Sequence, residues 1–123
     1  MLFRSFPSHD METYKTTPAV RRLSGTRKRE FNLVLYNTPS VTKDCNSYWD
    51  GGSIDKYAVL DMNGQYIRTP PSGDGLNKLA DPYVIQPGTL LMETGVFCGK
   101  PSVVCFYGHE SDRPWITKLL GIS

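Results

Sequence analysis

The sequence predicts an α+β protein, in which an antiparallel sheet of about five or six strands carries a short C-terminal helix on one face. Short segments after residue 30 alternate apolar and polar residues, and an Asn-Gly pair separates two of them. The end of the chain has an apolar stripe at helical spacing. Eleven glycines and nine prolines favour short strands joined by turns. A small β-sandwich or barrel is the alternative architecture.

The first expected strand covers residues 28–36. Phe31, Leu33 and Leu35 alternate with more polar neighbours, so one face of this strand is clearly apolar and the other is mixed. A turn around residues 37–40 then ends the strand, because Asn, Thr, Pro and Ser follow one another there.

The next two strands are expected at residues 57–62 and 65–69, on either side of Asn63-Gly64. An Asn-Gly pair between two such segments predicts a two-residue hairpin turn, because both central positions of that turn need a positive φ. The turn would pair Leu60 with Ile67 and place both side chains on the face that is expected in the core.

A second hairpin is expected near the C-terminus, with strands over residues 89–98 and 102–107. Gly99, Lys100 and Pro101 separate the two strands. The β-branched and aromatic residues of the second strand are typical of a central position in a sheet.

The final segment predicts a short helix that begins near Ser111 or Asp112, has Pro114 in its first turn and ends at Gly121. A helix this short is not stable alone in water, so it is expected to pack on the sheet. Its apolar stripe consists of Trp115, Ile116, Leu119 and Leu120.

Positive charge is concentrated at the start of the chain. Residues 1–30 include seven basic and three acidic residues and carry a net charge of +4, whereas residues 31–123 carry −2. Residues 1–26 show no sustained strand or helix period, and Met11 is an alternative translational start. We therefore expect a basic N-terminal arm at residues 1–29, flexible or irregularly wrapped, and a single globular β-rich domain at residues 30–123.

The composition also predicts a compartment. No segment approaches the roughly 18 apolar residues of a membrane-spanning helix, and the start of the chain lacks the apolar stretch of a secretory signal. The three cysteines Cys45, Cys98 and Cys105 are an odd number, so reduced thiols are expected. These features predict a small cytoplasmic protein with no membrane partner.

A basic cluster within the expected arm is the first candidate site. Such a cluster can neutralise phosphate groups in a manner that is independent of base sequence and sensitive to salt. Alternatively, it is a solvated linker. The candidate residues for binding nucleic acid or another polyanion are Arg21, Arg22, Arg27, Lys28 and Arg29.

Cys98 and His109 are weak candidates for a catalytic pair. A thiol nucleophile needs a histidine in direct contact and an orienting acid or amide, and Glu110 and Asp112 lie nearby in the sequence. The alternative is a buried thiol and a surface histidine. The cysteines lack the tight spacing of a structural zinc knuckle, so no metal site and no cofactor are expected.

The segment at residues 48–53 is the main candidate for a recognition surface. Large aromatic side chains beside a flexible Gly-Gly pair provide contact area at a low entropic cost. The alternative is that the tryptophan packs into the core. The residues expected to bind a partner are Tyr48, Trp49, Asp50 and Ser53.

Two stretches, Tyr-Trp-Asp-Gly-Gly-Ser at residues 48–53 and Gly-Val-Phe-Cys-Gly-Lys at residues 95–100, resemble small uncharacterised proteins of bacteria and their phages. With the strands between them, they lie within residues 48–107. The resemblance implies no activity and no functional residue.

The sequence therefore predicts a non-enzymatic interaction module, phage- or virus-associated, whose partner is a protein. One alternative is a small thiol-dependent hydrolase or transferase that uses Cys98 and His109. The other is a module that binds nucleic acid through the basic arm. The sequence does not indicate an oligomeric state.

Overall fold

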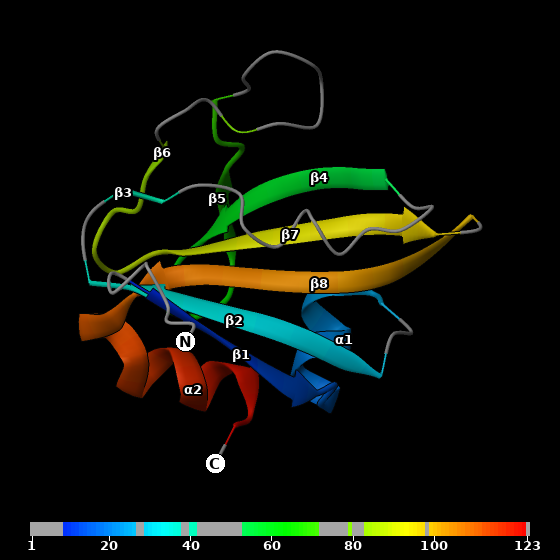
Figure 1. Cartoon of the computed structure of the whole chain (residues 1–123), viewed down its shortest axis with the longest axis horizontal. Helices are drawn as coiled ribbons and strands as arrows, with labels where there is room; N and C mark the ends of the chain where they lie inside the picture. Colours follow the sequence, from blue (N-terminus) through cyan, green and yellow to red (C-terminus); the bar gives the residue numbers. More distant parts are fainter. Residues whose placement is uncertain are drawn as a thin grey trace, which may run out of the picture.

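The computed structural model describes residues 9–26, 29–37, 40–41, 53–71, 79, 83–97 and 99–122. It confirms the α+β class, with a six-stranded, mostly antiparallel open sheet and a short C-terminal helix (Figure 1). The strands of this sheet, in spatial order, are β1 (His9–Lys15), β2 (Glu30–Tyr36), β8 (Lys100–His109), β7 (Leu90–Phe97), β4 (Ser53–Leu60) and β5 (Tyr66–Arg68).

The remaining described elements are a small second sheet and the helical segments. Strands β3 (Ser40–Val41) and β6 (Tyr83–Val84) form a separate two-stranded sheet. The helices are α1 (Pro18–Ser24), the 3-10 turn η2 (Glu110–Asp112) and α2 (Arg113–Leu120).

One pairing in the main sheet is parallel. β2 lies beside β8 with Phe31 opposite Val104, whereas all other neighbouring strands of this sheet are antiparallel. This pairing joins residues that are distant in the sequence, so it places a strand from the first third of the chain inside the sheet, between β1 and β8.

Each face of the sheet carries a cluster of buried side chains. The helices pack on one face, where Val20 of α1 and Ile116 and Leu120 of α2 are fully buried. The opposite face is aromatic and includes residues next to β6. We call this second cluster the tyrosine face; it consists of Val34, Tyr36, Tyr57, Val59, Leu79, Tyr83, Ile85, Leu91, Cys105 and Tyr107.

The expectation that the N-terminal segment lies outside the folded core is wrong for residues 9–26. β1 pairs with β2 along its whole length, and Val20 in α1 has no exposed surface. Thr17 caps α1 by accepting a hydrogen bond from the Val20 amide, and its hydroxyl donates to the Leu120 carbonyl of α2. This segment therefore stabilises the sheet edge and the helix layer together.

The first hairpin has a different register from the one predicted. Leu60 pairs with Tyr66 and not with Ile67, which is 42% exposed. The reason is the side chain of Asp61, whose Oδ1 accepts hydrogen bonds from the amides of Asn63 (2.8 Å) and Gln65 (2.9 Å). These bonds stabilise a longer loop in which Gly64 takes a positive φ of 82°.

The two C-terminal elements match their predictions. β7 and β8 form the second hairpin, with Phe97 opposite Lys100 at its end. α2 follows η2, has a proline in its first turn and ends at Gly121, whose φ is 79°. Ile116 and Leu120 of the expected stripe are fully buried, and Trp115 and Leu119 pack partly buried against the same cluster.

Candidate functional site

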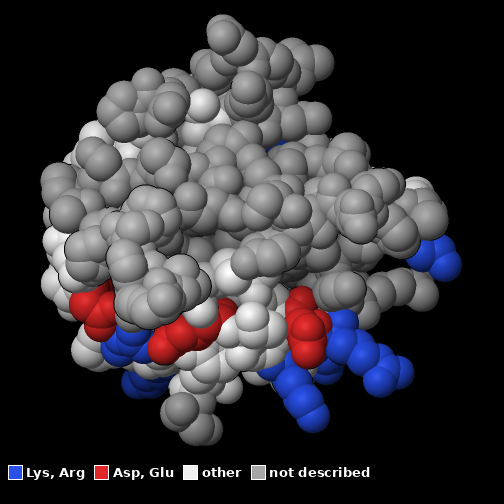
Figure 2. All heavy atoms as spheres, in the orientation of Figure 1, with Lys and Arg blue, Asp and Glu red and all other residues white. Residues whose placement is uncertain are grey.

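Four exposed basic residues gather where β1, α1 and β2 meet, and we call them the basic end: Lys15, Arg21, Arg22 and Arg29. The backbone of Thr16 lies at the centre of this group. The Thr16 amide donates to the Arg29 carbonyl at 2.6 Å, and Arg21 Nη1 donates to the Thr16 carbonyl at 3.5 Å. Figure 2 shows Lys and Arg side chains gathered at this end of the sheet, at the lower right of the view.

The basic end retains an excess of positive charge. Among the described residues, none of its four side chains forms an ion pair. Glu30 is the acidic residue nearest in the strand register, opposite Lys15. Uncompensated exposed cations attract polyanions, because the counterions of the polyanion are released on binding. Of the five basic residues predicted from the sequence, Arg27 and Lys28 lie outside the described residues.

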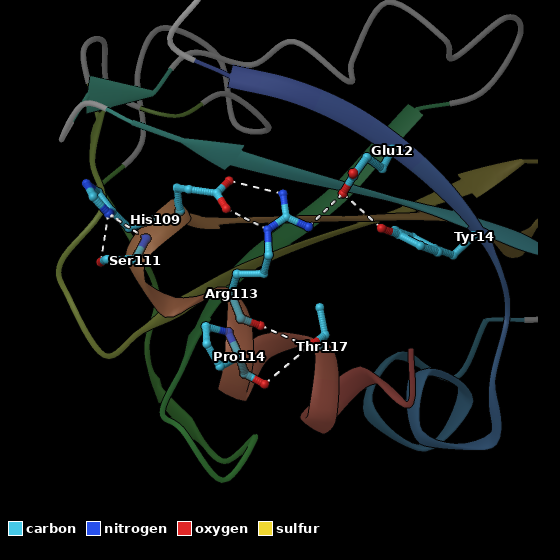
Figure 3. Close-up of polar contacts among 8 residues, drawn as sticks. Glu12, Tyr14, His109, Ser111, Arg113, Pro114 and Thr117 are labelled. Carbon is cyan, nitrogen blue, oxygen red and sulfur yellow. Dashed lines mark hydrogen bonds and ion pairs between the residues drawn. The ribbon is translucent and has the colours of Figure 1, made fainter. Parts of the chain in front are cut away.

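Arg113 is also a cation of the surface, but it is neutralised (Figure 3). Its Nη2 donates to Glu110 Oε1 at 3.0 Å, and its Nη1 donates to Glu12 Oε1 at 3.3 Å. The hydrogen bonds from Arg113 lower the pKa of Glu110, and those to Glu110 raise the pKa of Arg113. This network ties β1 to the start of α2, so it has a structural role and leaves little charge for a ligand.

Of the predicted catalytic pair, the structure describes His109 alone. Cys98 itself lies outside the described residues. Its neighbour Phe97, the last residue of β7, lies opposite Lys100, the first residue of β8. His109 is the last residue of β8. Nine residues of extended strand span about 30 Å. The fold therefore gives no support to direct contact between this thiol and the histidine.

His109 has a local structural role. Its Nδ1 accepts a hydrogen bond from the Ser111 amide at 3.2 Å and lies 2.9 Å from the Ser111 hydroxyl (Figure 3). The side chain thus caps η2 and orients the entry into α2.

The predicted recognition segment lies almost entirely outside the described residues. Tyr48, Trp49 and Asp50 lie outside the described residues, and Ser53 is described only as the first residue of β4. Binding by these residues stays a prediction.

The expectation of reduced thiols is wrong for Cys105, which forms a disulfide bond. Cys105 lies on β8 within the tyrosine face and is 1% exposed. Cys45 and Cys98 both lie outside the described residues.

The tyrosine face contains a buried carboxyl group that was not predicted from the sequence. Glu93 on β7 is 1% exposed, and its Oε2 accepts a hydrogen bond from the Tyr57 hydroxyl at 3.2 Å. The Tyr107 hydroxyl donates to Oε1 of the same group. Burial, followed by the charge of Glu93, raises the pKa of Tyr107 well above its usual value. The sequence does contain one indication of this burial: Glu93 alternates with Leu91 and Gly95, which places it on the same face of β7 as an apolar residue.

Within the described ranges, no group of three or more His, Cys, Asp or Glu side chains is placed to hold a metal ion. None of the described helices is both long and apolar enough to cross a membrane. Comparisons of the chain with family models, curated proteins and solved structures found no match.

Proposed function

We propose that the protein is a non-enzymatic binding module and that its basic end binds the phosphate backbone of nucleic acid. The observation that supports this proposal is the convergence of Lys15, Arg21, Arg22 and Arg29 on one exposed end of the sheet without ion-pair partners among the described residues. The contrast with Arg113, which two carboxylates neutralise, makes this end the stronger electrostatic site.

Backbone binding of this kind predicts a strong salt dependence. Four phosphate contacts give a slope of about −3.6 in log K against log salt concentration on duplex DNA. Affinity should therefore fall by roughly 100-fold between 50 and 200 mM salt. No base-sequence preference is expected, because contacts to phosphates carry no sequence information directly.

The test is fluorescence anisotropy with a short labelled DNA duplex of random sequence. The variant Arg21→Gln/Arg22→Gln removes two charges and keeps helix propensity, because Gln and Arg are similar in a helix. We expect the salt slope to become less steep by about two and the affinity to fall at least tenfold at low salt.

The matched control is Lys100→Gln/Lys118→Gln, which removes the same charge from exposed positions outside the basic end. We expect it to change the affinity by about twofold or less. Equal losses in both variants, or no binding by the unaltered protein at low salt, would contradict the proposal. Deletion of residues 1–29 is unsuitable as a test, because it removes β1 and α1.

Protein binding through residues 48–53, a phage- or virus-associated role and a thiol-dependent activity of Cys98 and His109 stay predictions. The cytoplasmic location also stays a prediction, and the disulfide bond of Cys105 favours an oxidising compartment instead.

A further inference from the structure

We infer that Asn63 is a modification site, at which the side-chain amide is lost by spontaneous deamidation, and that the side chain of Asp61 keeps this reaction slow in the folded protein. Asn63 is exposed in the loop between β4 and β5. Gly64 follows it directly, and the chain contains no second Asn-Gly pair. A glycine in this place favours the reaction, because it has no Cβ atom to hinder the approach of its own backbone nitrogen.

The reaction is a ring closure followed by hydrolysis. The backbone nitrogen of Gly64 attacks Cγ of Asn63, so that a C–N bond forms, this nitrogen loses its proton, and the side-chain amide group takes up a proton and leaves as ammonia. Water then adds to a carbonyl carbon of the cyclic imide and breaks a C–N bond of the ring, which gives aspartate or isoaspartate. The overall change consumes water and releases ammonia, and it needs no oxidant or reductant.

The folded loop holds the two reacting groups apart. The Gly64 amide, whose nitrogen would attack, donates a hydrogen bond to the Asp61 carbonyl at 3.0 Å. Asn63 therefore has the second central position of a four-residue turn, where ψ is about 0°. Ring closure requires rotation about the Cα–C bond of Asn63, because Cβ and the attacking nitrogen lie on the same side of that bond in the ring. This rotation would break the turn.

The side chain of Asp61 stabilises the unreactive conformation. Its Oδ1 accepts hydrogen bonds from the amides of Asn63 at 2.8 Å and Gln65 at 2.9 Å. These two bonds restrain the residues on both sides of Gly64, and the Asp61 amide closes the loop by donating to the Gln65 carbonyl at 2.9 Å. The reaction therefore proceeds from the small fraction of molecules in which this loop has opened locally.

The loop also packs against the helix layer. A Cβ atom at Gly64 would lie 3.0 Å from Leu23 Cδ2 of α1 and 3.2 Å from Leu119 Cδ1 of α2. Isoaspartate at position 63 would add a carbon atom to the main chain beside this contact, and both products add a negative charge to a loop that contains Asp61. The modified protein is therefore expected to have a weakened β4–β5 hairpin.

The test follows deamidation of the full chain by peptide mapping and mass spectrometry, in which the replacement of NH2 by OH changes the peptide mass. In guanidinium chloride we expect Asn63 to react before the other asparagines. In the folded protein the reaction of Asn63 should be at least about tenfold slower than in guanidinium chloride. Earlier reaction of another asparagine in the unfolded chain, or equal rates at Asn63 in the folded and unfolded protein, would overturn the inference.

Three variants separate the role of Asp61 from global stability. Asp61→Ala removes the acceptor, so Asn63 should react about tenfold faster in the folded variant. Asp61→Asn keeps an acceptor oxygen that can form the same bonds, so the rate should rise by less than about threefold. Tyr107→Phe weakens the opposite face of the sheet and should change the rate by about twofold or less.

An unchanged rate in Asp61→Ala would overturn the protective role of Asp61. Equal acceleration in Asp61→Ala and Tyr107→Phe would overturn it as well, because the reaction would then depend on global unfolding. If Asp61→Ala does not fold, the comparison of the unaltered protein with and without guanidinium chloride, together with Asp61→Asn, still decides the inference.

Discussion

The hydroxyl group of Tyr107 on β8 donates a hydrogen bond to Oε1 of Glu93 on the neighbouring strand β7, and both side chains are almost completely buried. Tyr57, on the other side of β7, donates to Oε2 of the same carboxyl group. Burial of a carboxyl group is unfavourable unless hydrogen bonds replace its contacts with water. The two tyrosines therefore help to keep Glu93 in the interior of the tyrosine face.

Replacement of Tyr107 by Phe should destabilise the fold by about 2 kcal/mol, because a hydrogen bond to a charged group is lost inside the protein. Tyr57→Phe should cost less, because Tyr57 is 7% exposed whereas Tyr107 is fully buried. Urea unfolding followed by circular dichroism measures both changes. Tyr66→Phe is the control: this tyrosine is 61% exposed, so its loss should change stability by less than about 0.5 kcal/mol. A similar loss in Tyr66→Phe and Tyr107→Phe would contradict the role of burial.

Stability should decrease in alkaline solution, and Tyr107 should account for part of the decrease. Burial raises the pKa of Tyr107 in the folded state, whereas the unfolded chain has the ordinary tyrosine pKa of about 10. Below that pH both states keep the proton. Above it the unfolded state loses the proton first, so the free energy of unfolding falls as pH rises, until the folded pKa is reached.

The measurement is the free energy of unfolding at pH values from about one unit below to one unit above the ordinary tyrosine pKa of about 10. Tyr107→Phe should show a shallower decrease than the unaltered protein. Identical pH dependence in the two proteins would contradict the assigned pKa direction.

Gly108 marks a close approach between β8 and α2. A Cβ atom at this position would lie 2.6 Å from Ile116 Cδ1 and 3.3 Å from Leu35 Cδ2. Gly108→Ala should therefore destabilise the protein by about 1–3 kcal/mol through overpacking. Ile116→Val removes the contacting methyl group and costs about 1 kcal/mol alone. The double variant should lose less stability than the sum of the two single losses, as measured by thermal or urea unfolding. Strict additivity would argue against this contact.

The ion pair between Glu12 and Arg113 should contribute little to stability. Their side chains are 38% and 37% exposed, and exposed pairs contribute about 1 kcal/mol or less. A double-mutant cycle with Glu12→Gln and Arg113→Gln measures their coupling, which should weaken as salt is added. A coupling that is large and independent of salt would show that the pair is shielded from solvent.

Glu110 should make the same network sensitive to acid. The hydrogen bonds from Arg113 lower the pKa of Glu110, so its contribution to stability is present above the ordinary carboxyl pKa and is lost as pH falls through the lowered value. Arg113→Gln should reduce this loss, which is measured as the fall in the free energy of unfolding at decreasing pH. Equal acid sensitivity of the two proteins would contradict this role of Arg113.

The sequence predicts those parts of the fold that depend on local chemistry. Pro114 and Gly121 bound α2, and the apolar residues of β7 and β8 are typical of a hairpin. β1 could not be predicted in this way, because an edge strand with charged residues such as Glu12 and Lys15 has no clear apolar alternation. The predicted register of the first hairpin was also wrong, because the side chain of Asp61 and not the Asn-Gly pair determines the loop.

The candidate sites were less predictable than the fold, because they depend on contacts between distant residues. The basic end acquires Lys15 through strand pairing, which no run of charges in the sequence could indicate. Glu93 becomes notable because tyrosines on the two neighbouring strands donate hydrogen bonds to its carboxyl group. The distance between Phe97, at the end of β7, and His109, at the end of β8, follows from the length of β8, which was predicted to start two residues later.

The parallel pairing of β2 with β8 has a consequence for the synthesis of this protein. Phe31 leaves the ribosome long before Val104, its partner in the sheet, has been translated. Until then β2 can associate with β1, but one of its edges remains open to other chains. Long-range pairing of this type slows folding. Newly made chains should therefore depend on chaperones, or on low concentration, until the last strand is released.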